Sequence, residues 1–131
     1  MSDFDYDKTQ EVDQVMGAAL LTRRRVIETV GFMDEKFWLW YEEVDFCKRV
    51  KTAGYKIIFF PEPIIMHIGG QSFSQFDIYK RKKTLAKSLI YYFEKNGKRW
   101  EVWALKILMP AVLVISWIIT KLVTSPHPSP R

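Results

Sequence analysis

Cysteine is nearly missing from this sequence, since Cys47 is the only one among 131 residues. One thiol excludes an intramolecular disulfide, and no cluster of His and Cys with zinc-site spacing accompanies it, so a reducing cytosolic setting fits best. A secretory signal is also missing, because residues 1–13 are acidic and contain no apolar run. There is no internal repeat, and the length suits one small domain rather than a complete two-domain enzyme.

The charge is distributed unevenly along the chain. Residues 1–47 carry 11 acidic and 5 basic side chains, whereas residues 48–131 carry 4 acidic and 15 basic ones. Eight of the basic side chains lie between Lys80 and Arg99, where Glu94 is the only acidic one. A nucleic acid can bind such a patch, but no RNA- or DNA-binding motif accompanies it. Because an apolar segment follows, we expect a membrane rather than a nucleic acid as the partner.

The apolar segment runs without a charge from Ile107 to Thr120. Fourteen residues are short for a bilayer, which asks for about 20 residues in a helix. Lysine ammonium groups at helix ends can extend to the headgroups, and this lengthens the candidate span to residues 102–123. Pro110 removes a backbone donor and predicts a kink. A full crossing, a dip into one leaflet and a buried core helix all remain open for residues 100–124.

The positive-inside rule gives the orientation if this segment crosses. It places residues 1–99 in the cytoplasm and residues 125–131 outside. The sequence of that tail, SPHPSPR, predicts a disordered end. The predicted localisation is therefore a membrane, with the soluble part facing the cytoplasm.

The remaining pattern predicts a mixed α/β domain. Residues 1–11 form a flexible acidic arm. A long basic helix is expected from about residue 73 to residue 95, in a basic helical segment over 74–99. Gly31 and Gly54 are expected to end two shorter helices. The elements expected between them are a buried strand over 12–22, helices over 24–30 and 42–53, a strand over 55–60 and an extended piece over 64–67.

Three carboxylates, those of Glu42, Glu43 and Asp45, fall in the first turn of the expected helix over 42–53. A helix N-terminus favours anions by roughly 0.3–1 kcal/mol, so an acidic first turn is common without any catalytic role. Mutual repulsion and the neighbouring aromatic residues can also raise the pKa of one carboxyl group, as a general base requires. Both interpretations stay open at this point.

His67 and the loop after it are the other candidates for chemistry. A single histidine is usually structural, and a metal site would need further ligands. The loop offers backbone N–H groups and a hydroxyl to an anion, although two glycines alone are a weak signal. Its residues are Gly69, Gly70, Gln71 and Ser72.

The order of these pieces resembles the C-terminal half of the catalytic domain of family 2 glycosyltransferases, and most closely the bacterial rhamnosyltransferase-like members. The resemblance covers roughly residues 12–95. It implies a partial GT-A fold, of which residues 12–73 are the acceptor-side half. The matching motifs are Gly17-Ala18, Arg23-Arg24, Gly31 to Phe37, Tyr41 to Cys47, Ala53 to Tyr55, Pro61, His67 and Gly69 to Ser72.

The resemblance also implies roles for the candidate residues. The segment Glu42-Glu43-Val44-Asp45 corresponds to one that usually contains Glu-Asp-x-Asp, so Glu43 takes the place of the base that deprotonates the acceptor hydroxyl. His67 matches a histidine that helps to bind the metal or the donor diphosphate, and Gly69 to Ser72 form an acceptor or phosphate loop. A divalent cation, Mg²⁺ or Mn²⁺, is expected for the complete enzyme.

The family reaction transfers a sugar with inversion from a nucleotide-sugar donor to a lipid-linked or polysaccharide acceptor at the bacterial inner membrane. These enzymes carry a preceding half with the nucleotide-binding strands and an Asp-x-Asp metal motif. In this sequence only Asp3-Phe4-Asp5-Tyr6-Asp7 resembles that motif, and we interpret it as a solvated acidic arm because no apolar strand precedes it. The chain then represents a truncated product, works with a separate chain carrying that half, or has lost catalysis. The alternative function is a non-catalytic, membrane-bound interaction module derived from such an enzyme.

Overall fold

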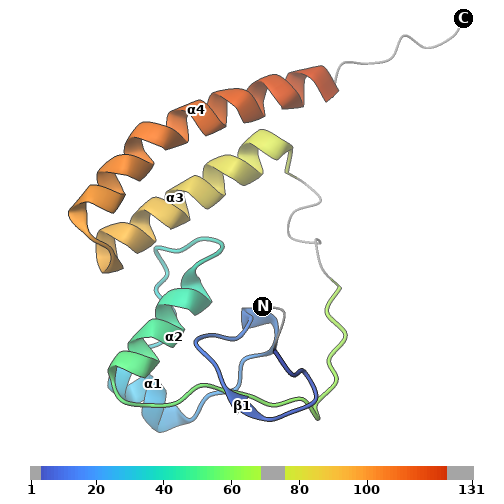
Figure 1. The fold of residues 1–131 in the computed structure, drawn as a ribbon, viewed down its shortest axis with the longest axis vertical. Helices are drawn as coiled ribbons and strands as arrows, with labels where there is room; N and C mark the ends of the chain where they lie inside the picture. The colour runs from blue at the N-terminus through green and yellow to red at the C-terminus, as the bar shows by residue number, and fades with distance from the viewer. Residues whose placement is uncertain (1–3, 69–75, 124–131) are drawn as a thin grey trace, which may run out of the picture. The chain divides into compact units, whose positions relative to one another are not determined.

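The computed structural model describes residues 4–68 and 76–123, which belong to two compact units, Met1–Ile68 and Gly69–Arg131. Figure 1 shows a mixed α/β chain that is mostly helical, with a small two-stranded sheet. The predicted mixed α/β class is confirmed at this level. Residues 125–131, for which a disordered tail was predicted, and the loop Gly69 to Ser72 lie outside the described residues.

The sheet of the first unit consists of β1 (Gln10–Glu11) and β2 (Ile58–Phe59). The strands are antiparallel, with Gln10 opposite Phe59 and Glu11 opposite Ile58. One further backbone bond, from the N–H of Val12 to the carbonyl of Ile57 at 3.0 Å, continues this pairing. The predicted strand over 55–60 is therefore correct in type and shorter than expected.

The strand predicted over 12–22 is wrong. Only its first residue, Val12, continues the pairing, through its bond to Ile57, and a short 3-10 helix, η1 (Gly17–Ala19), occupies the middle of the run. Ala19 donates to the carbonyl of Met16 at 3.2 Å, so the backbone bonds locally. Apolar side chains suggested a buried strand, but the side chain of Leu21 is 99% exposed.

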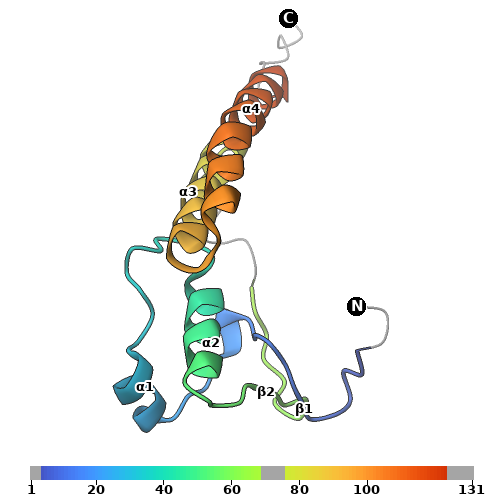
Figure 2. The same cartoon turned by 60° about the vertical axis from the view of Figure 1, so that its left-hand side comes forward.

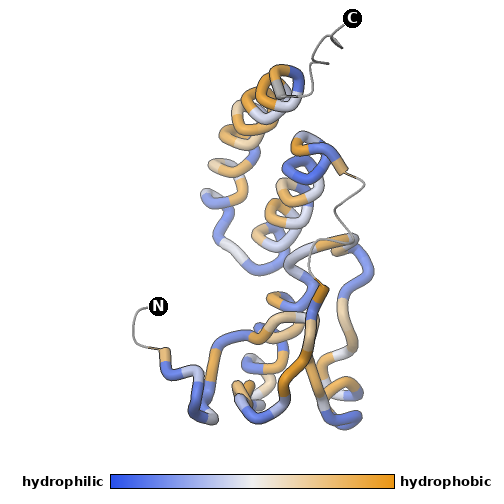
Figure 3. Tube along the Cα trace, turned by 90° about the vertical axis from the view of Figure 1, so that its right-hand side faces the viewer, coloured by the Kyte–Doolittle hydropathy of each residue, from blue (hydrophilic) through white to orange (hydrophobic). Residues whose placement is uncertain are grey.

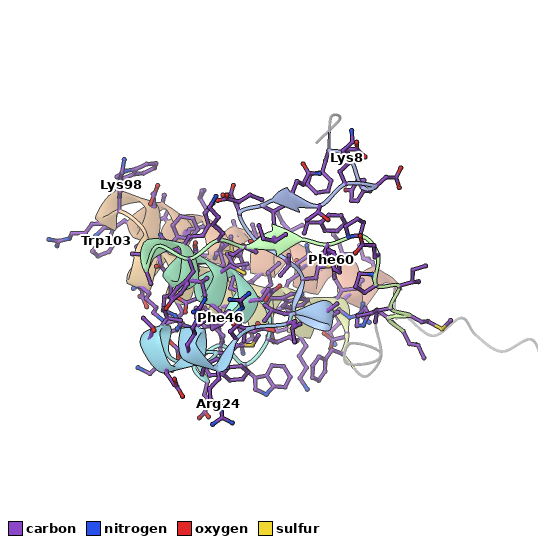
Figure 4. The ribbon with its side chains drawn as sticks, turned by 90° about the horizontal axis from the view of Figure 1, so that it is seen from below. Lys8, Arg24, Phe46, Phe60, Lys98 and Trp103 are labelled. Atoms are coloured by element: carbon purple, nitrogen blue, oxygen red, sulfur yellow. The ribbon has the colours of Figure 1, made fainter. Side chains whose placement is uncertain are left out.

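Two helices supply most of the core of the first unit, α1 (Arg24–Val30) and α2 (Glu42–Thr52). Phe46, Cys47 and Val50 share one face of α2 because residues three and four apart are neighbours on a helix, and they pack with Val26 of α1. In Figure 4, Phe46 lies at the centre of this unit, whereas Arg24 points outward. Both helices match their predicted bounds to within one residue.

The second unit is a helical hairpin of α3 (Ile78–Asn96) and α4 (Arg99–Val123). The Asp77 carboxylate caps α3 by accepting from the N–H of Lys80 at 2.6 Å, which explains why α3 begins later than the predicted residue 73. At the turn, Gly97 donates to the carbonyl of Phe93 at 2.8 Å. Figures 1 and 2 show the two helices side by side along their length.

Candidate functional site

The candidate site is the first turn of α2, which carries the carboxylates of Glu42, Glu43 and Asp45. The sequence predicted this arrangement, and the structure brings the three residues together on one helix end. The backbone N–H groups of a helix N-terminus carry a partial positive charge that stabilises carboxylates. Glu43 also faces η1, because a Cβ added at Gly17 would lie 3.7 Å from the Cβ of Glu43.

The backbone that enters this turn is strained. Trp40 and Tyr41 have φ angles of 63° and 72°, and Tyr41 is the N-cap residue of α2, with no side-chain cap. A left-handed backbone costs bulky residues about 1–2 kcal/mol each, so two such residues in a row persist only where the surrounding packing holds them. Sequence analysis missed this feature because aromatic side chains give no signal for a left-handed backbone.

The carboxylates of Glu42 and Glu43 each bury one oxygen, Oε2, without a hydrogen-bond partner in the described part of the chain. A buried carboxylate oxygen without a donor is costly, and natural proteins keep such groups mainly where they have a role. Burial raises the pKa of Glu42, its own backbone N–H opposes that shift, and the neighbouring charge of Glu43 adds to it. The Glu42 side chain therefore holds a proton more readily than a solvated glutamate does.

The raised pKa of Glu42 predicts a pH dependence of stability. Between its ordinary value and its raised value, the folded chain keeps a proton that the unfolded chain releases, so the free energy of unfolding falls as pH rises through this range. Glu42→Gln is expected to flatten this fall and to stabilise the chain at neutral pH. Urea unfolding of both proteins at several pH values measures the difference. A parallel pH dependence in both would contradict the prediction.

Asp45 has a different environment, because its side chain is fully buried. Nε of Arg49 donates to Oδ2 of Asp45 at 2.8 Å. The same guanidinium donates to the carbonyls of Val30, Gly31 and Phe32, the last at 2.7 Å. Asp45 thus anchors Arg49, and Arg49 ties the end of α1 to α2. A catalytic role of Asp45 stays a prediction. Sequence analysis missed Arg49, although its spacing of four residues from Asp45 is a visible signal.

His67 is exposed, in the chain segment that follows β2. Within residues 4–68 and 76–123, no hydrogen bond or ion pair joins it to the acidic turn of α2, and no three His, Cys, Asp or Glu side chains gather as metal ligands. The described residues alone therefore do not fit a divalent cation. The expected ligand role of His67 stays a prediction, and we derive no step through a metal.

The other functional feature is α4. Its segment Arg99–Leu122 is long and apolar enough to cross a membrane, and very little of its most apolar part is buried. Figure 3 shows hydrophobic residues along most of this helix. Together with the glycosyltransferase likeness reported next, this helix suggests membrane association.

Two known glycosyltransferases are similar to this chain over short stretches. The low-salt glycan biosynthesis hexosyltransferase Agl10 of Haloferax volcanii is 33% identical over 46 residues, which are 35% of this chain and 15% of the relative. The N-acetylglucosaminyl-diphospho-decaprenol L-rhamnosyltransferase of Mycobacterium tuberculosis is 32% identical over 56 residues, 43% of this chain and 18% of the relative.

These matches define the class of the chain only in outline. No family model and no solved structure matches it. The chain spans less than a fifth of the length of the curated relatives it matches. Short matches to two different sugar-transferring enzymes support a glycosyltransferase-related fragment, which the motif pattern had predicted.

Proposed function

We propose that this chain is the acceptor-side part of a membrane-associated, inverting family 2 glycosyltransferase with the GT-A fold. The complete enzyme transfers a sugar, which we propose to be rhamnose, from a nucleotide-sugar to a lipid-linked or polysaccharide acceptor of the cell envelope. The observation that carries the proposal is the acidic turn of α2, where strained backbone precedes two carboxylates with buried, unpartnered oxygens. The similarity to a hexosyltransferase and a rhamnosyltransferase supports it.

In the proposed reaction, Glu43 is the general base. Its carboxylate takes the proton of the acceptor hydroxyl while the hydroxyl oxygen attacks the anomeric carbon from the face opposite the leaving group. The bond from that carbon to the donor diphosphate breaks, and the nucleoside diphosphate leaves with the electron pair. Glu42, with its raised pKa, lies beside the base and limits the negative charge near it.

The donor side of the proposed site comes from elsewhere. We assign the nucleotide-binding strands and the site of the divalent cation, Mg²⁺ or Mn²⁺, to a part of the enzyme other than the described residues, among which no three His, Cys, Asp or Glu side chains gather. We assign binding of the donor diphosphate to His67, on the exposed segment after β2. The phosphate-loop role of Gly69 to Ser72 stays a prediction from the sequence. The proposed location is the bacterial inner membrane, with the first unit on the cytoplasmic side.

The isolated chain is expected to transfer no sugar, because one half cannot hold the donor. Adding the part of the mycobacterial rhamnosyltransferase that this chain does not match should restore transfer. The assay uses nucleoside-diphosphate-rhamnose as donor and N-acetylglucosaminyl-diphospho-polyprenol as acceptor, with the added part alone as the control. Transfer by this chain alone, or none by the mixture although the two parts bind each other, would contradict the proposal.

A second candidate function is a non-catalytic, membrane-bound interaction module. The exposed apolar side chains of Leu21, Ile64 and Met66, which suit a protein contact, favour it. Detergent-free membrane fractionation combined with a nucleotide-sugar and acceptor binding assay separates the two functions. Both predict recovery with membranes, but only the glycosyltransferase predicts affinity for donor or acceptor.

A further inference from the structure

The basic helix α3 packs against the apolar helix α4 as an antiparallel hairpin. Near the turn, Nζ of Lys106 lies 2.7 Å from Oε1 of Glu94. At the other end, Tyr79 shares a small apolar hollow with Leu113, Val114 and Trp117. The first turn of α3 therefore lies beside the middle of the charge-free run of α4.

That first turn is the most basic part of the hairpin. Lys80, Arg81, Lys82 and Lys83 follow one another and are all exposed. Successive residues of a helix point about 100° apart, so four in a row surround α3 almost completely. Whatever medium covers this end of α3 thus contacts several cations.

This arrangement conflicts with α4 crossing a bilayer while α3 stays packed on it. A crossing would place Leu113 near the centre of the membrane. It would bring the four cations of α3 to the same depth. Each charge there disfavours insertion by roughly 100-fold. A spanning hairpin needs its charged side chains near its ends. Here four exposed cations lie beside the apolar middle of α4.

The outer side of α4 is apolar over a wide arc. Trp103, Ile107 and Ile118 are exposed on it. Ser116, by contrast, is buried, and its hydroxyl donates to the carbonyl of Val112 at 2.7 Å, so this polar group is satisfied within the helix. One side of the hairpin therefore presents hydrocarbon, and α3, about 8–10 Å away by ordinary helix packing, presents positive charge.

We propose that the hairpin binds an anionic lipid leaflet in the plane of the membrane, with α4 immersed at the acyl boundary and α3 at the phosphate level. Helices that lie in the interface bury an apolar face by about 5–10 Å, which agrees with one helix layer below the headgroups. The basic turn of α3 then contacts lipid phosphates, and both ends of α4 stay on the same side. This inference rests on the hairpin alone and is independent of sugar transfer.

Vesicle binding tests the lipid specificity. The full chain is expected to cosediment with vesicles of equal parts phosphatidylcholine and phosphatidylglycerol, and far less with phosphatidylcholine alone. The triple variant K80Q/K82Q/K83Q should lose up to about 100-fold in partitioning to the anionic vesicles, because each cation near such a surface contributes to binding. High salt should weaken binding of the unchanged chain more than that of the variant.

A matched control removes three positive charges from the first unit, where consecutive arginines are also exposed. This variant, R23Q/R24Q/R25Q, should keep its binding to anionic vesicles. An equal loss in both triple variants would indicate an effect of net charge only and would overturn the proposal. So would a chain that forms a dimer in solution and leaves the vesicles unbound, since a second copy would then cover α4.

Topology is tested by synthesis in the presence of inverted inner-membrane vesicles, with single added cysteines as reporters. S125C should react with a membrane-impermeant maleimide without detergent, to the same extent as T9C in the first unit. Reaction of S125C only after detergent would show a crossing and overturn the proposal. The unchanged chain gives the background, because Cys47 is only 2% exposed.

Discussion

Arg49→Ala is expected to lower the free energy of unfolding of the first unit by about 3–5 kcal/mol, because it removes the guanidinium that pairs with the fully buried carboxylate of Asp45. It also removes the donor to the carbonyls of Val30, Gly31 and Phe32. Small domains have about 5–15 kcal/mol in total, so the loss is large. Urea unfolding followed by tryptophan fluorescence measures it, with Trp38 and Trp40 in the segment that leads into α2.

Lys51→Ala provides the matched control on the same helix. Lys51 pairs with Asp13, but both groups are solvent-exposed, and exposed ion pairs contribute little to stability. We expect its unfolding midpoint to stay close to that of the unchanged chain. Similar losses in Arg49→Ala and Lys51→Ala would show that burial of Asp45 does not determine the strength of the contact.

Glu43→Gln is expected to reduce sugar transfer by about 100- to 10,000-fold in the restored two-part enzyme, since general base catalysis contributes effects of this size. The amide keeps the shape of the side chain and removes its ability to take the acceptor proton. The measurement is the initial rate of transfer under saturating donor and acceptor. Unchanged rates would remove Glu43 from the role of base.

Two further variants separate chemistry from structure in that experiment. Glu35→Gln changes an exposed carboxylate outside α2 and should leave the rate unaltered. Glu43→Asp keeps the carboxylate and shortens the side chain by one methylene, to the aspartate expected here if the proposed function is right, so transfer should persist. Loss of activity in Glu43→Asp equal to that in Glu43→Gln would mean that the geometry of the turn, rather than the charge, limits the rate.

The helices of this chain could be predicted from sequence because their signals are local. Gly31 ends α1 with a φ angle of 77°, and Gly54 follows α2 with a φ angle of 83°, as the glycine pattern predicted. The acidic first turn and the apolar α4 were equally visible. These features depend on residues close together in the chain, which is why no knowledge of the packing was required.

The strand over 12–22 could not be predicted correctly, because apolar composition indicates burial only when something covers the chain. Leu21 and Met16 are apolar but exposed here, and the backbone follows a 3-10 turn instead. The left-handed backbone at Trp40 and Tyr41 was missed for a related reason. The local preference of both residues opposes a left-handed backbone, so the local sequence gives no signal for it.

The segment after β2 has a consequence for how this protein is produced in a cell. Ile64 and Met66 are 96% and 89% exposed. Exposed apolar chain beside a short sheet invites pairing with other polypeptides and hence aggregation. Soluble yield should therefore depend on what is co-expressed with the chain. In the absence of a partner protein or lipid, we expect chaperones to bind this segment.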